Sequence, residues 1–426
     1  MQGVSSNVIR IESSSARNGI RPNSTISFAL PAATIGRLST FQIHGKFSTT
    51  GASKLPDDIM MLVQRCECSA NGVLISGGST YYNTIRALKK ALTGKRADRV
   101  RQHGSLITTD MVGNAYTGST GETSIASIGG WDYGLLACDT DYVDTELIGN
   151  IVIKITLASP DVLIGAGATY TVDDVYATME CISINNPLYD SMISQQLSTA
   201  GYVPITFPEA QCTKSTHNTL TRVNCSSRSL RRIMVGFKHK NMDVAGPEVL
   251  TSGGKETIWD GTIPDGGAFV EKVAKDGNPY TATAPCNVFG SATQSSAASI
   301  MASDDSAYFD MGGSRFPQFE ARLGNEWIML RKQALYHEEL HDELIRKDLC
   351  GTDIFDVANV LAAKLSLSGS ASSTLASGID SRGAAVTLSV NTTGTIGQST
   401  NTVCYFCTET DSLLQVGSQR QIALLR

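Results

Sequence analysis

Apolar and polar residues alternate along many short stretches of the chain. Ile26, Phe28 and Leu30 are separated by polar or small residues, and the same spacing returns in the isoleucines of residues 151–157. Successive side chains of a β-strand point to opposite faces, so these runs predict half-buried strands. Comparable runs predict further strands at 41–47, 59–76, 175–182, 202–207, 227–238, 306–323, 386–390, 403–408, 413–416 and 422–424.

The clearest hairpin is predicted at residues 59–76. Leu62, Cys66 and Cys68 share one face of its first strand, and Asn71-Gly72 then supplies a tight turn before the chain returns. Asn-Gly between alternating segments favours a two-residue hairpin turn. Because strand alternation already explains the two cysteines, we interpret them as small core residues and not as metal ligands.

Helical periodicity is confined to a few segments. Ser79 or Thr80 can cap a helix with an apolar stripe at Tyr82, Ile85, Leu88 and Leu92. A second helix is predicted after residue 186, because Asn186 is a good N-cap, Pro187 suits the first position and Gly201 supplies the stop. A third is predicted over 327–347.

The first of these helices carries a basic face and tail. Asp98 is the only acid against seven cations, namely Arg86, Lys89, Lys90, Lys95, Arg96, Arg99 and Arg101. Such a cluster can contact nucleic acid or anionic lipid. A solvated face or a salt-bridging interface is the commoner use of such a segment, and we favour it here.

The predicted elements repeat in order on either side of residues 170–208. Each half has strands, one helix, a loop-rich stretch (107–148 and 241–305) and a long closing strand, which suggests an internal duplication. Many short strands with long loops predict an all-β fold with a few short helices, built as antiparallel sandwiches with Greek-key connections. The expected division is an N-terminal arm at 1–24, a first sandwich at 25–186, a helix and connector at 187–208, and a second sandwich at 209–426.

Composition narrows the class of protein. With 426 residues the chain can bury two cores, and its net charge of −5 is unlike that of a dedicated nucleic-acid binder. Ten cysteines are scattered without a framework, which favours reduced thiols in an intracellular setting. The N-terminus lacks the pattern of a signal peptide and no apolar run reaches membrane-spanning length, so synthesis in the cytoplasm is expected.

One motif is typical of catalysis. His337, Glu338 and His341 match H-E-x-x-H within a predicted helix, where two histidines could bind zinc and Glu338 could act as general base. A catalytic zinc needs a third protein ligand, but no histidine follows His341 and the flanking residues are acidic. A zinc metallohydrolase is therefore the alternative hypothesis. No Walker loop, nucleophile elbow or dinucleotide fingerprint occurs, and we expect no catalytic, cofactor or metal site.

The order of segments resembles that of the double jelly-roll major capsid proteins of DNA viruses, the adenovirus and tectivirus lineage, and within it the polinton-like viruses and virophages. The resemblance covers most of the chain. It is carried by CECSANGVLISGGSTYYNTIRAL, YTVDDVYATMECISINNPLYDSMISQQLSTAGYVPITF, SSRSLRRIMVGFKHK, DMGGSRFPQFEARLGN and ASGIDSRGAAVTLSVNTTG…VCYFCTETDSLLQV. The acidic HEELH helix and the short chain depart from the virophage pattern.

This resemblance implies two tandem jelly-roll β-sandwiches whose long insertions at 107–148 and 241–305 form outward towers. It implies a homotrimeric, pseudo-hexagonal capsomer that tiles an icosahedral shell around a DNA genome, located in the virion. The implied partners are the chain itself, neighbouring capsomers, and penton and minor capsid or cement proteins. The inner surface is a candidate for weak contact with the genome or an internal membrane. A β-rich adhesin or fibre is a third class, but it would predict a secretion signal.

Overall fold

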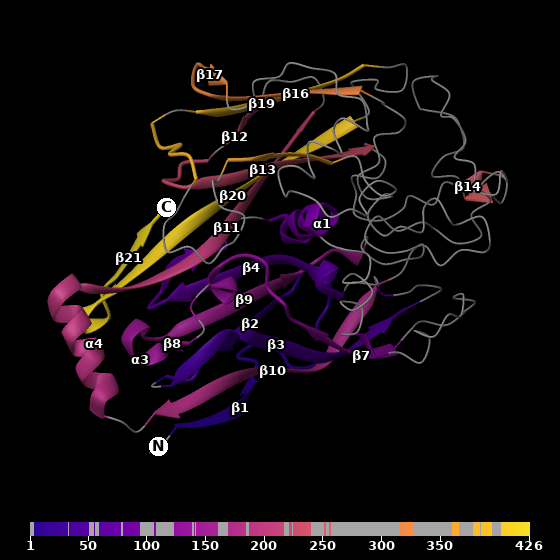
Figure 1. The fold of residues 1–426 in the computed structure, drawn as a ribbon. Coiled ribbons are helices and arrows are strands. Elements are labelled where there is room, and N and C mark those ends of the chain that lie inside the picture. The colour runs from indigo at the N-terminus through magenta and orange to yellow at the C-terminus, as the bar shows by residue number, and fades with distance from the viewer. Residues whose placement is uncertain are drawn as a thin grey trace.

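The chain forms two β-rich units, each made of two sheets. The computed structural model describes residues 4–32, 34–50, 55, 59–77, 80–93, 106–107, 123–138, 140, 142–160, 169–184, 187–216, 221–223, 225–239, 251–252, 255–256, 316–327, 360–365, 378–383, 385–393 and 402–426. Within these residues every strand pairs antiparallel with strands of its own half. In Figure 1 the first unit lies below and the second above.

The first unit contains a six-stranded and a four-stranded sheet. Their orders are β1-β10-β3-β7-β6, with β8 paired to β3, and β2-β9-β4-β5. The strands are β1 (Val4–Glu12), β2 (Thr25–Ala29), β3 (Ile35–Thr49), β4 (Val63–Ala70), β5 (Val73–Ser76), β6 (Leu106–Ile107), β7 (Thr123–Ile128), β8 (Val143–Asp144), β9 (Ile151–Leu157) and β10 (Tyr170–Ile184). Its helical elements are η1 (Ile59–Leu62), α1 (Tyr82–Thr93), η3 (Leu135–Ala137) and α3 (Thr145–Ile148).

The second unit repeats this plan. One sheet has the order β11-β20-β13-β18, with β21 also paired to β20, and the other has the order β12-β19-β16-β17. The elements are β11 (Tyr202–Thr216), β12 (Thr221–Val223), β13 (Leu230–His239), β16 (Phe316–Leu323), β17 (Glu326–Trp327), β18 (Val360–Lys364), β19 (Val386–Thr393), β20 (Thr402–Gly417), η7 (Ser418–Arg420) and β21 (Ile422–Leu425). A short hairpin, β14 (Thr251–Ser252) and β15 (Lys255–Glu256), stands apart.

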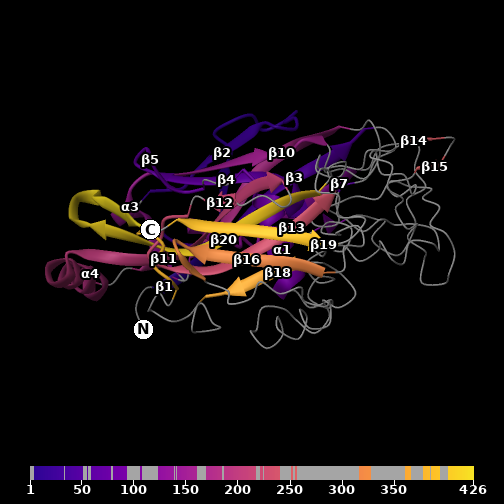
Figure 2. The same cartoon turned by 90° about the horizontal axis from the view of Figure 1, so that it is seen from above.

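Helix α4 (Pro187–Ala200) connects the two units. It follows β10, the last strand of the first unit, and Gly201 (φ 79°) ends it in the left-handed conformation before β11 begins. This confirms the predicted sequence of strand, helix and connector. Figures 1 and 2 show α4 at one end of the strands, away from the two sheet pairs. Asn186, the predicted cap, lies outside the described residues.

Local prediction was accurate where alternation and turn chemistry agree. The hairpin of β4 and β5 is present, with Asn71 (φ 51°) and Gly72 (φ 81°) at its turn. Cys66 and Cys68 are buried in the core, as interpreted. Tyr82, Ile85 and Leu88 form the buried stripe of α1.

Three expectations were wrong because they treated low periodicity as lack of structure. Within the supposed arm at 1–24, β1 pairs along its full length with β10. Within the supposed insertion at 107–148, residues 123–138 and 142–148 form β7, η3, β8 and α3 and supply core residues. The two strands predicted at 403–416 are one, because β20 continues through Asp411.

A continuous apolar core runs from the first unit into the second. Phe28, Phe41 and Phe47 are fully buried in the first unit, and Phe41 packs on Trp131 with ring centroids 6.3 Å apart. The same cluster extends to Phe207, Tyr405 and other residues of β11, β13 and β20. Helix α1 lies between the units (Figure 1) and contacts β4 on one side and β11, β13 and β18 on the other. The units are therefore docked on each other through buried surface.

Candidate functional site

The main cluster of buried charge lies where α1 meets the second unit. Arg86 is only 5% exposed, forms an ion pair with Asp132, and donates to the carbonyl of Gly130 at 2.6 Å. A buried guanidinium is tolerated only when it is paired and hydrogen-bonded, and both conditions hold here. Arg86 is therefore a structural cation, which agrees with the salt-bridging alternative predicted for the basic stretch and not with a solvated face.

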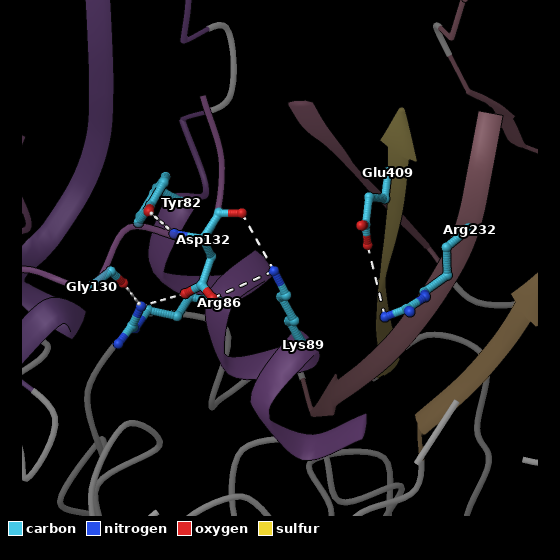
Figure 3. Close-up of polar contacts among 7 residues, drawn as sticks. All are labelled: Tyr82, Arg86, Lys89, Gly130, Asp132, Arg232 and Glu409. Atoms are coloured by element: carbon cyan, nitrogen blue, oxygen red, sulfur yellow. Dashed lines mark hydrogen bonds and ion pairs between the residues drawn. The ribbon is translucent and has the colours of Figure 1, made fainter. Parts of the chain in front are cut away.

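Lys89 reaches the same carboxylate one helical turn later. Its Nζ lies 3.5 Å from Asp132 Oδ1 and 4.6 Å from the centroid of the Tyr133 ring. The backbone N–H of Asp132 donates to the Tyr82 hydroxyl at 3.1 Å. Figure 3 shows Tyr82, Arg86 and Lys89 of α1 converging on Asp132, which links α1 to the segment after β7. Residues 95–101 of the predicted basic stretch lie outside the described residues.

The second unit presents a charged pair to this cluster. Arg232 of β13 lies beside Glu409 of β20, with Nη1 and Oε2 3.8 Å apart and side chains 17% and 7% exposed (Figure 3). Neither of these atoms, nor the Tyr133 hydroxyl, has a hydrogen-bond partner within the described residues. Burial and then the charge of Glu409 raise the pKa of Tyr133 well above its ordinary value, so the phenol stays protonated.

A second polar contact follows the edge of β11. Glu209 is buried, accepts from Ser412 Oγ at 2.9 Å and pairs with Arg426 at 3.1 Å. Burial raises the pKa of Glu209, while Arg426 and the Ser412 hydrogen bond oppose that rise. These residues lie at a cavity of about 40 Å³ between the units, which is lined by Cys66, Gly77, Tyr82, Ile85, Tyr133, Gly134, Glu209, Ala210, Gln211 and Arg426. Drug-sized ligands occupy pockets of about 300–1,000 Å³, so this cavity is too small for such a ligand but large enough for water.

The geometry of these residues serves docking better than chemistry. Each carboxylate faces a cation or a hydroxyl, and the aromatic rings of Tyr81 and Tyr405 meet edge-to-face across the boundary with centroids 5.6 Å apart. Within the described residues, no group of three or more His, Cys, Asp or Glu side chains could hold a metal ion. The zinc candidates His337, Glu338 and His341 lie outside the described residues. Among the residues that the structure describes, no helix is long and apolar enough to cross a membrane.

The sequence identified α1 but not its partners. Asp132 and Tyr133 belong to a stretch without periodicity, and Glu409 lies on a strand that gives no sign of what it faces. The nearest signal was the sequence Trp131-Asp132-Tyr133, because two large aromatics in a loop-rich region indicate burial. Trp131 indeed donates its indole N–H to the carbonyl of Phe41 at 2.7 Å.

Comparison with solved structures finds the same arrangement over the whole chain. A capsid protein from a quasi-atomic model of the PBCV-1 virus capsid is 13% identical, with coverage of 100% of this chain and 97% of its own and a TM-score of 0.59. The Faustovirus major capsid protein is 8% identical, with coverages of 98% and 91% and a TM-score of 0.56. A protein of the Sputnik virophage is 8% identical, with coverages of 99% and 88% and a TM-score of 0.52.

Sequence comparisons add nothing to this likeness. No family model matches the chain, and no curated protein matches it in sequence. The likeness at such low identity concerns the path of the backbone, and it agrees with the pair of sheets in each half of the chain. The chain has the double jelly-roll fold that these viral capsid proteins share.

Proposed function

We propose that this chain is a structural major capsid protein of a DNA virus, which trimerises into pseudo-hexagonal capsomers. One observation carries the proposal: two jelly rolls of similar build are fixed side by side in one chain by a buried interface. Solved viral capsid proteins with the same fold, matched over nearly their full lengths, support it.

The physical reasoning concerns symmetry. A trimer of a two-sandwich chain presents six similar sandwiches around one axis, so a threefold assembly approximates a sixfold outline and can tile a flat facet. This requires the two sandwiches to keep one relative orientation. The Gly134–Pro208 backbone hydrogen bond, the ring contact of Tyr81 with Tyr405 and the apolar core shared between the units support such rigidity.

The proposal assigns the chain a place in the virion and no catalytic role. Its partners would be further copies of itself, then penton and minor capsid or cement proteins, with the genome or an internal membrane as candidates for weak contact on the inner surface. We propose the domain division expected from the sequence, except that β1, within the supposed arm, belongs to the first sandwich. The parts of the expected insertions at 107–148 and 241–305 that lie outside the described residues are proposed to form the outward towers.

The test is assembly of the purified full-length chain. A homotrimer should have three times the chain mass of 45.3 kDa by light scattering or mass photometry, and electron microscopy should show hexagonal particles. A chain that stays monomeric at high concentration, and whose particles lack hexagonal capsomers, contradicts the proposal. Metal analysis of the same sample tests the zinc alternative separately, because that alternative requires stoichiometric zinc.

A further inference from the structure

Two cysteines face each other across neighbouring strands of the second unit. Cys212 of β11 and Cys407 of β20 are directly opposite in the antiparallel register, and their Sγ atoms are 2.8 Å apart. Directly opposite residues of an antiparallel pair have Cα atoms about 4.5–5.5 Å apart and side chains on the same face. Disulfides need Cα atoms about 4.4–6.8 Å apart, so the backbone already satisfies this requirement.

The two thiols differ in access to solvent. Cys212 is half-buried on an edge strand, whereas Cys407 is fully buried on the central strand of the sheet. All the other cysteines whose burial the structure describes are buried, namely Cys66, Cys68, Cys138, Cys181 and Cys225. A small oxidant would therefore meet Cys212 first, and Cys407 would be its nearest thiol.

We propose that Cys212 and Cys407 form a redox pair that closes to an intrachain disulfide when the chain meets a small-molecule disulfide. The Cys212 thiolate attacks one sulfur of the oxidant, which forms a mixed disulfide at Cys212 and releases one thiol. Cys407 then loses its proton to solvent, and its sulfur attacks Cys212 Sγ and displaces the second thiol. Two protein thiols are oxidised by two electrons, and the oxidant is reduced to two thiols.

The acid–base chemistry supports this order of attack. Burial, and then the neighbouring Cys212, raises the pKa of Cys407 well above the ordinary thiol range. Cys407 therefore stays protonated at neutral pH and is a poor first nucleophile. As the second nucleophile it needs no diffusion, because the sulfur that it attacks is already beside it.

The bond would fix a strand that holds the units together. Strand β11 begins directly after α4, pairs with β20 and carries Pro208, whose carbonyl accepts a hydrogen bond from Gly134 of the first unit. The two cysteines are 195 positions apart, so the crosslink closes a long loop and restricts the unfolded chain strongly. The inference does not rest on the proposed function. Reducing compartments keep the pair as thiols, and oxidising surroundings close it.

The experiment uses the full chain, reduced, desalted and incubated with 2-hydroxyethyl disulfide, which is small and uncharged. Alkylation followed by mass spectrometry under non-reducing conditions should show two thiols lost per chain and one crosslinked peptide pair, Cys212 with Cys407. The thermal midpoint should rise by roughly 5–10 °C and return on reduction. If both cysteines remain alkylatable, or if the crosslink joins Cys404 to Cys407 or two chains, the proposal is overturned.

Three variants separate this pair from the remaining cysteines. Cys407→Ala should trap the mixed disulfide at Cys212, and Cys212→Ala should lose no thiol at Cys407. Cys212 is half-buried, so the latter variant tests the pair even if removal of the buried Cys407 impairs folding. Cys225→Ala is the matched control. Cys225 is buried beside Ser381, so this variant should leave the Cys212–Cys407 crosslink unchanged. Loss of the crosslink in this control would count against the assignment.

Discussion

Gly134 of the first unit donates its backbone N–H to the carbonyl oxygen of Pro208 in the second, at 2.7 Å. Pro208 lies on β11, which is the edge strand of its sheet. Proline has no N–H, so the edge leaves no unpaired donor at this residue while its carbonyl receives a partner. The contact sets the position of one unit against the other through backbone atoms alone. Asp132 lies two residues before Gly134, and Glu409 is paired in register with Ala210, two residues after Pro208.

Replacing Asp132 tests the energetic weight of the buried ion pair. Asp132→Asn leaves the Arg86 guanidinium buried without a counter-charge, which should lower the free energy of unfolding by about 3 kcal/mol. This is the lower end of the range for such losses, because the Asp132 side chain keeps 23% exposure. Urea unfolding followed by fluorescence measures the change.

The matched control for that variant is Asp380→Asn. Asp380 pairs with Arg382 on the surface, with side chains 51% and 45% exposed, so its removal should leave the unfolding midpoint unchanged. The double variant Arg86→Met/Asp132→Leu should regain most of the stability, because it removes both buried charges. If Asp132→Asn and Asp380→Asn behave alike, the buried pair does not hold α1 in place.

Two glycines with positive φ should respond differently to alanine. A Cβ on Gly77 (φ 103°) would lie 2.2 Å from the carbonyl oxygen of Cys66, so the backbone at the cavity between the units must move. Gly72 (φ 81°) has open space around it. We expect Gly72→Ala to cost about 1–2 kcal/mol from the left-handed backbone alone, and Gly77→Ala more than about 3 kcal/mol. Equal midpoints of Gly72→Ala and Gly77→Ala in thermal unfolding would show that the backbone of the first unit shifts at Gly77 without loss of stability.

How far the sequence predicts this molecule depends on the range of the interactions. The β4–β5 hairpin is encoded by local alternation and Asn71-Gly72, and α4 by Pro187 at its first position and Gly201 at its end, so both were predicted. The partner of Arg86 was not predicted, because Asp132 is 46 residues away and no helical pattern reports it. The facing of Cys212 and Cys407 depends on the register of strands 195 residues apart, which periodicity does not fix.

Glu209 should make stability depend on pH in a specific direction. Because burial holds its pKa in the folded chain above the ordinary value of a glutamate, the folded state binds the proton more tightly than the unfolded state. Its contribution to stability is therefore full below about pH 4.5 and is lost as the pH rises through the raised value. Glu209→Gln lacks this titration, so the midpoint of the native chain minus that of the variant should fall as pH rises from roughly 4 to 7.

Arg426 supplies the internal control for that titration. Its guanidinium opposes the rise in the pKa of Glu209, so Arg426→Met should enlarge the fall in midpoint between acid and neutral pH. Thermal unfolding of the three proteins at several pH values at fixed ionic strength measures this. If the midpoints of the native chain and of Glu209→Gln change in parallel with pH, Glu209 has the same pKa in the folded and unfolded states.

Helix α4 should matter more for assembly than for folding. Met192 is 68% exposed, and most side chains of the helix face solvent, so little core depends on it. Met192→Pro removes an internal hydrogen bond and breaks the helix, at about 3 kcal/mol of local helix stability, whereas Met192→Ala keeps a good helix former. In the proposed capsomer the helix would set how β10 leads into β11. We therefore expect the proline variant to keep its circular dichroism and thermal midpoint but to lose trimers in mass photometry, and the alanine variant to keep both. The same division is expected for Leu197→Pro against Leu197→Ala. An equal loss of soluble protein and of trimers in the proline variants would place the role of α4 in folding instead.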